Sequence, residues 1–112
     1  MLRNPNMMDL DPIHNALLNS AIGFTFGTDN IQIHQIQSNG AISDVGSIGG
    51  VYNPTSVALD PSYQFVYTCE VDGFTGQPQV ISMKYSANGS GSIFNGPLAR
   101  PSANAIQIAV SR

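Results

Sequence analysis

Two carboxylates in one short segment are the strongest candidates for chemistry in this sequence. Glu70 and Asp72 stand two positions apart, directly after an apolar stretch. Carboxylates this close together in a loop are able to bind a sugar hydroxyl, hold a cation or act as a general base. The alternative interpretation is that both are solvated loop side chains. We take this pair as the first candidate for a catalytic site.

Four other residues are candidates to complete such a site. Arg100 offers bidentate contacts to an anionic substrate such as a sugar phosphate, or it pairs with a neighbouring carboxylate on the surface. Asp29, in the first long loop, is likewise either a ligand-binding residue or an ordinary surface side chain. Phe24 and Phe74 are predicted ligand-binding residues because aromatic rings stack on sugars, and core packing explains them as readily.

The other reactive residues form no recognisable constellation. A single cysteine, Cys69, excludes an internal disulfide and a multi-cysteine zinc site. It has no basic neighbour in sequence, so we expect a buried, inert thiol. His14 and His34 have no spacing typical of metal ligands. We therefore predict neither a metal nor a cofactor.

Composition excludes several function classes. The 112 residues carry a net charge of -3 and only 10% are charged, so no basic patch neutralises nucleic-acid phosphates. No apolar run approaches the ~18–20 residues of a membrane span. No signal peptide is visible, although the low charge favours a secreted or periplasmic protein. A hydrophobic content of 42% suffices for one folded domain.

An internal repeat defines the elements that position the candidate residues. Asp11-Pro12 recurs as Asp60-Pro61, an offset of 49 residues from position 11 to position 60, and Asn39-Gly40 recurs as Asn88-Gly89 with the same offset. The apolar positions that share it are Leu10 and Leu59, Ile31 and Val80, and Ile36 and Tyr85. A period near 50 is in the range of propeller blades.

Each unit has the pattern of a four-stranded antiparallel meander. An apolar stretch that ends in Asp-Pro predicts a strand and a tight turn, because Asp accepts hydrogen bonds from the amides ahead and Pro presets φ. Asn-Gly predicts the hairpin before the fourth strand. We expect fourth strands at 42–48 and 92–98, with Ile42 matching Ile93 after a two-residue insertion in the second unit.

The predicted fold is therefore all-β, built of β-propeller blades. One blade spans about 8–50, the next about 55–99, and 105–110 begins a third, within a single partial propeller domain over 1–112. No segment has a convincing helical period. Repeat units need neighbours on both faces. We expect either other copies of the chain or the remainder of a longer protein to provide them.

The second unit resembles one blade of the lactonase-like, YVTN-type β-propellers, which include the 6-phosphogluconolactonase-like enzymes. The resemblance rests on 54–61, Phe65-Val66-Tyr67, 80–85 and Asn88-Gly89. It implies a seven-bladed ring whose ligand face carries the loops 23–30 and 70–77 and the junctions 49–55 and 99–102. In the first unit Leu17-Leu18 replaces the usual aromatic-containing pair.

Three hypotheses for function follow from this resemblance. The leading one is a partial repeat module with no complete active site of its own. The second is a sugar-lactone hydrolase in a full ring, with Glu70, Asp72 and Arg100 facing the channel. The third is a carbohydrate- or protein-binding oligomeric propeller. The implied ligand is a sugar or sugar lactone, and neither nucleic acid nor membrane is an expected partner.

Overall fold

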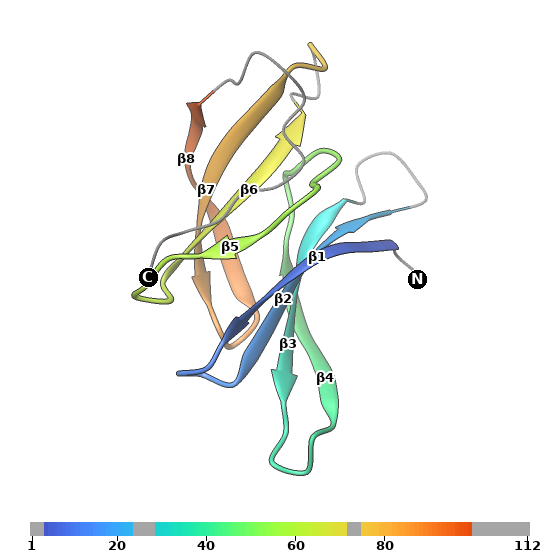
Figure 1. The fold of residues 1–112 in the computed structure, drawn as a ribbon, viewed down its shortest axis with the longest axis vertical. Coiled ribbons are helices and arrows are strands. Elements are labelled where there is room, and N and C mark those ends of the chain that lie inside the picture. The colour runs from blue at the N-terminus through green and yellow to red at the C-terminus, as the bar shows by residue number, and fades with distance from the viewer. Residues whose placement is uncertain (1–3, 24–28, 72–74, 100–112) are drawn as a thin grey trace.

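The computed structural model describes residues 4–23, 29–71 and 75–99, and this part of the chain is all β. Two four-stranded antiparallel sheets follow each other in chain order, and neither closes on itself (Figure 1). Sheet 1 contains β1 (Asn4–Asp11), β2 (Ala16–Ile22), β3 (Asn30–Ile36) and β4 (Ile42–Ile48). Sheet 2 contains β5 (Ala58–Leu59), β6 (Phe65–Val71), β7 (Pro78–Ser86) and β8 (Ser90–Ala99). The expected all-β class is confirmed, whereas 105–110 lies outside the described residues.

The two sheets repeat each other in register. Leu17 pairs with His34 in sheet 1, and moving both positions by 49 residues gives Val66 and Met83, which pair in sheet 2. An irregularity in the pairing of the last two strands also recurs, beside His34 and beside Met83. The 49-residue offset in the sequence is therefore a structural repeat.

One detail of the sequence alignment is wrong. Ile36 pairs with Ile42 and Tyr85 pairs with Gly91, so Ile42 is equivalent to Gly91 and not to Ile93. The extra residues of the second unit lie later, where a second irregularity interrupts the pairing of β7 with β8. The tight turn fixes the register next to it, so an insertion is accommodated as a bulge further along the strand.

Both Asp-Pro turns are held by their aspartates, as predicted. Asp11 Oδ1 accepts hydrogen bonds from the amides of Ile13 and His14, each at 3.0 Å. Asp60 Oδ1 does the same for two amides further along its own turn, at 3.0 and 2.8 Å. These bonds satisfy backbone donors where the chain reverses, which fixes the end of β1 relative to β2 and that of β5 relative to β6.

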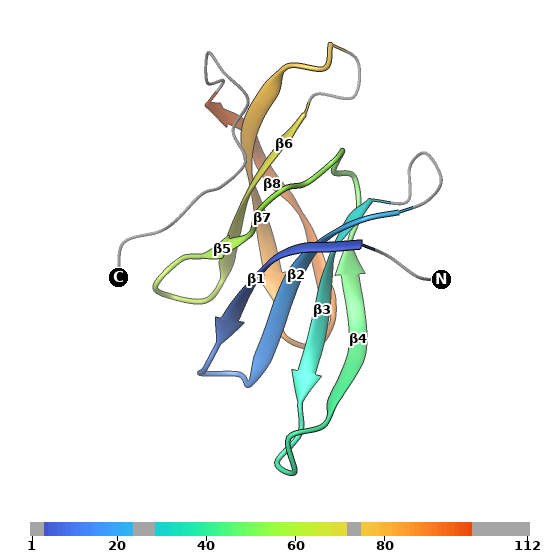
Figure 2. The same cartoon turned by 45° about the vertical axis from the view of Figure 1, so that its right-hand side comes forward.

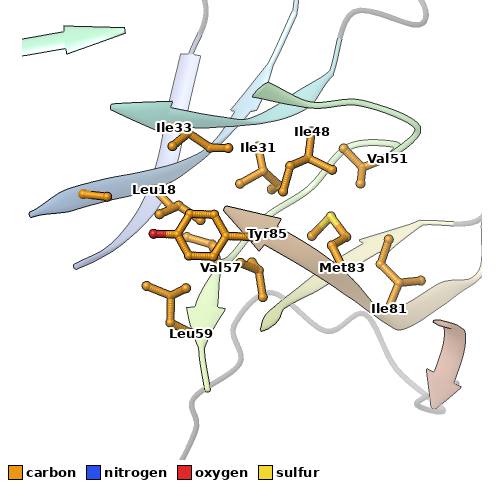
Figure 3. Packing of buried hydrophobic residues seen from close by; sticks show 12 residues of the cluster. Leu18, Ile31, Ile33, Ile48, Val51, Val57, Leu59, Ile81, Met83 and Tyr85 are labelled. Atoms are coloured by element: carbon orange, nitrogen blue, oxygen red, sulfur yellow. The ribbon is translucent and has the colours of Figure 1, made fainter. Parts of the chain in front are cut away.

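The hydrophobic core lies between the two sheets. Figure 3 shows Leu18, Ile31 and Ile33 of sheet 1 beside Met83 and Tyr85 of sheet 2. The buried cluster comprises Ala16, Leu18, Ile31, Ile33, Ile48, Val51, Val57, Leu59, Val66, Ile81, Met83 and Tyr85, each 6% exposed or less. Burial of such a side chain contributes ~1.5–3 kcal/mol, so the sheets stabilise each other.

Equivalent strands of the two sheets lie against each other. β1 lies beside β5, and β4 lies beside β8 (Figure 2). At the second contact the backbones nearly touch, because a Cβ added to Gly46 would overlap the carbonyl group of Gly89. Gly89 itself has a φ of 103°, a conformation that favours glycine. Glycines therefore permit the close approach of the β7–β8 hairpin to β4.

The two units contribute opposite faces to the core. Leu18 and Ile33 of sheet 1 are buried in it, but their equivalents 49 positions later, Tyr67 and Ser82, lie on the far face of sheet 2. Conversely, Met83 lies in the core while its equivalent, His34, lies on the far face of sheet 1. The units are thus packed head to tail, with unlike faces in contact.

Candidate functional site

The structure describes two of the six predicted site residues. Glu70 lies near the end of β6, and Asp29 directly precedes β3. The remaining four candidates fall outside the described residues; they are Phe24, Asp72, Phe74 and Arg100.

Glu70 is a buried carboxylate with hydrogen-bond donors on both oxygens. It is 5% exposed, so its interpretation as a solvated loop side chain is wrong. Its Oε2 accepts a hydrogen bond from the amide of Tyr52 at 2.9 Å, and its Oε1 accepts one from Nε2 of Gln79 at 2.8 Å. Tyr52 belongs to the linker between the sheets. Glu70 therefore attaches this linker to β6 and β7.

Asp29 holds the next residue of the same linker. Its Oδ2 accepts a hydrogen bond from the amide of Asn53 at 2.7 Å, and its Oδ1 accepts one from the amide of Gly23 at 2.9 Å. Asn53 has a φ of 47°, which asparagine tolerates better than most residues. We call Asp29, Glu70 and the two linker residues Tyr52 and Asn53 the linker clamp. Glu70 of sheet 2 binds the amide of Tyr52, and Asp29, next to sheet 1, binds the consecutive amide of Asn53.

A third carboxylate joins the sheets at the opposite end, by the Asp-Pro turn of β1. Asp11 is fully buried, and its Oδ2 accepts a hydrogen bond from Tyr85 Oη at 2.6 Å. The same oxygen lies 2.6 Å from Nδ1 of His14, whose side chain is half exposed. The neighbouring Asp9 accepts a hydrogen bond from the amide of Leu59 across the sheets at 2.8 Å.

This environment shifts the pKa values of both partners. Burial by itself would raise the pKa of Asp11, but the hydrogen bonds from Tyr85 and His14 outweigh it and hold the pKa below its usual value. Burial and the adjacent Asp11 carboxylate raise the pKa of the Tyr85 hydroxyl well above its usual value. The neutral phenol therefore donates to an ionised carboxylate, a charge-assisted bond between the sheets.

Sequence reasoning did not place Tyr85 beside Asp11. A signal was present, because the equivalent of Tyr85 in the first unit is Ile36, and a buried tyrosine hydroxyl requires a partner. The choice of partner depends on which faces of the two units meet. The repeat alone does not determine that choice.

A third cluster of polar side chains lies on the far face of sheet 1. His34 Nε2 lies 2.6 Å from Asn19 Oδ1, and His34 Nδ1 lies 2.5 Å from Asp44 Oδ1. Asn19 Nδ2 donates in turn to Gln32 Oε1 at 3.2 Å. The histidine is partly exposed and points away from Ile31, as the strand alternation predicts. A His–Asp pair activates nucleophiles in many enzymes, but amide side chains complete this cluster.

Other site types find little support in the described part of the chain. No three His, Cys, Asp or Glu residues gather there to hold a metal ion, and no helix there could cross a membrane. Cys69 is a buried free thiol, as expected. An open pocket of about 320 Å³ borders the β7–β8 hairpin, lined by Lys84, Tyr85, Ser86, Ser90, Gly91 and Ser92. Its lining contains no carboxylate or imidazole.

Comparison with known proteins returned no relative. A scan against protein-family models, a search of curated proteins and a search of solved structures each found no match for this chain. The packing of the two sheets and the carboxylate contacts are therefore the observations that bear on its function.

Proposed function

We propose that the chain is a two-blade module of a lactonase-like β-propeller, a structural repeat unit with no complete active site of its own. The observation that carries the proposal is the head-to-tail contact of the two sheets. Leu18 of the first unit is in the core, while its equivalent in the second unit, Tyr67, is on the far face. Such a contact leaves one unlike face at each end for further units, as blades around an axis require.

The meeting of equivalent strands is a second support. β1 against β5 and β4 against β8 correspond to a rotation that carries one unit onto the next, with first strands on one side and fourth strands on the other. A two-fold sandwich of the same repeats would bring identical faces together instead. The glycine contact between Gly46 and Gly89 brings the fourth strand of one unit against the hairpin of the next.

The contacts of the described carboxylates are a third support. Glu70 and Asp29 each accept hydrogen bonds on both oxygens from groups of this chain, including the consecutive amides of Tyr52 and Asn53. Carboxylates bonded in this way position the linker between the sheets. The proposal assigns them that role, and a catalytic role for Glu70 would require it to release these partners.

Hydrolysis of a six-carbon sugar lactone by the purified chain tests this proposal. We expect no ring opening beyond the buffer rate, and no change with Glu70→Gln. Saturable hydrolysis that falls with Glu70→Gln, in a variant whose circular dichroism is unchanged, would overturn the proposal in favour of a lactonase. Saturable sugar binding without turnover would overturn it in favour of a carbohydrate-binding propeller.

A further inference from the structure

The far face of sheet 1 combines exposed apolar side chains with a polar cluster. We call it the open face; it comprises Met8, Leu10, Leu17, Asn19, Gln32, His34, Ile36, Ile42 and Asp44. Met8 is 62% exposed, Leu10 45% and Ile42 56%. Large apolar side chains gathered on one exposed face are typical of an interaction surface.

The repeat identifies what kind of surface the open face contacts. Moving Leu10 and Leu17 by 49 residues gives Leu59 and Val66, and both are fully buried between the sheets. Tyr85, the equivalent of Ile36, is buried there too. The open face is thus the same structural face that, in the second unit, packs against the face of sheet 1 that carries Leu18. The surface that matches the open face is therefore a sheet face equivalent to the Leu18 face of sheet 1.

Sheet 2 has such a face, pointing away from sheet 1. The equivalents of Leu18 and Ile31 on it are Tyr67 and Val80, both half-buried. The smaller side chains of this face, Ala58, Cys69 and Ser82, are 5%, 1% and 4% exposed, so Tyr67 and Val80 are the side chains that it offers to a partner. The open face and this face lie on opposite sides of the two-sheet unit, so one chain cannot join them. We propose, building on the function proposed above, that the open face of one chain packs against the far face of sheet 2 in a second copy, head to tail.

Side-chain size is conserved between the observed contact and the proposed one. Inside the chain, Leu18 shares the core with Tyr85. In the proposed contact between copies, Tyr67 takes the place of Leu18, and Ile36 takes the place of Tyr85. Each contact therefore combines one aromatic ring with one aliphatic side chain, contributed by opposite faces in the two cases. Cores tolerate exchanges of this kind when the total volume is preserved.

The polar cluster on the open face is compatible with such burial. His34 contacts Asn19 and Asp44, and Asn19 donates to Gln32, so these side chains already engage one another. A covering sheet therefore leaves few of them without a partner. The equivalent of His34 in the second unit is the fully buried Met83.

Light scattering on paired variants tests the proposal. We expect the wild-type chain to form multimers, and we expect Leu10→Lys on the open face or Tyr67→Lys on the far face of sheet 2 to weaken association at least about tenfold. A mixture of the two variants retains one intact pair of faces and should form a one-to-one dimer. Ile13→Lys is the matched control, because Ile13 is 69% exposed but lies in a turn outside both faces.

Several results would overturn the proposal. A wild-type chain that stays monomeric at millimolar concentration contradicts it, as does a mixture of the two lysine variants that stays monomeric while each is folded by circular dichroism. Met8→Lys, at a more exposed position of the open face, replaces Leu10→Lys if that variant unfolds. A monomer without lactonase activity refutes only the contact between copies, whereas lactone hydrolysis refutes the proposed function.

Discussion

Removal of the Tyr85 hydroxyl tests the contact that joins the two units at their Asp-Pro end. Tyr85→Phe deletes the 2.6 Å hydrogen bond to the fully buried, ionised Asp11 and keeps the ring in the core. A hydrogen bond to a charged group contributes ~1.5–3 kcal/mol. With an unfolding entropy of ~2.1 cal/mol/K per residue, the 112 residues should lose about 6–13 °C in Tm.

The pH dependence of stability provides a second, independent readout of the same bond. The pKa of Tyr85 is raised in the folded state, so its contribution is complete below the unfolded-state pKa of ~10 and is lost as the pH rises above it. The pKa of Asp11 is lowered, so its contribution is present above ~3.9 and is lost as the pH falls below that. We expect the stability difference between wild type and Tyr85→Phe to narrow above pH ~10.

Urea unfolding of Tyr85→Phe, Asp11→Asn and the double variant measures the coupling between the two groups. We expect a coupling energy of about 1 kcal/mol or more, within the usual range for residues in contact. Tyr67→Phe is the control, because it removes a hydroxyl from the far face of sheet 2 and should change stability by about 0.5 kcal/mol or less. Additive effects of the two substitutions would refute the proximity of Asp11 and Tyr85.

Three more predictions concern the linker clamp, the glycine contact and the acid limit of stability. Glu70→Gln should lower the free energy of unfolding in urea by ~1–3 kcal/mol. The loss should exceed that of Asp29→Asn, because Glu70 is buried while Asp29 is half-buried. Equal effects of the two substitutions would contradict the role of Glu70 as the buried anchor of the linker. Gly46→Val should lower the free energy of unfolding by more than the ~1–3 kcal/mol typical of overpacking, because the added Cβ would overlap backbone atoms of Gly89. Gly49→Ala should fold normally, because a Cβ added there meets no neighbouring atom. Burial alone would raise the pKa of Asp60, but hydrogen bonds from Ser62 and nearby amides outweigh it and lower the pKa. The free energy of unfolding should therefore fall less steeply with pH below pH ~4 in Asp60→Asn than in the wild type. An unchanged pH dependence would refute this assignment.

Local signals were sufficient to predict most of the strands. The fourth strand of the first unit occupies Ile42–Ile48, as expected from the Asn-Gly turn before it, and β7 covers the expected 80–85. Alternation correctly separated Ile33 from His34. These features depend on residues near each other in sequence, where turn chemistry and a period of two act directly.

The relation between the two units was beyond such signals. The bond from Tyr85 to Asp11 joins residues 74 positions apart, and it exists only because unlike faces meet. The two-residue insertion of the second unit lies later than the alignment of Ile42 with Ile93 places it, because the pairing of β7 with β8 is irregular there. Composition does not predict the position of such an irregularity. The burial of Glu70 similarly depends on where the linker returns, so neither its interpretation as a catalytic candidate nor the solvated alternative predicts its hydrogen bond with the amide of Tyr52.

Methyl NOEs from two adjacent leucines test the head-to-tail packing most directly. Leu17 and Leu18 project from opposite faces of β2, and only Leu18 lies in the core with Met83 and Tyr85. With assigned methyl groups, we predict NOEs from Leu18 to the Tyr85 ring in the monomeric Leu10→Lys variant, and none from Leu17 to that ring or to Met83. NOEs from Leu17 to Met83, or from Leu18 to the Tyr67 ring, would mean that like faces meet, and they would contradict the account.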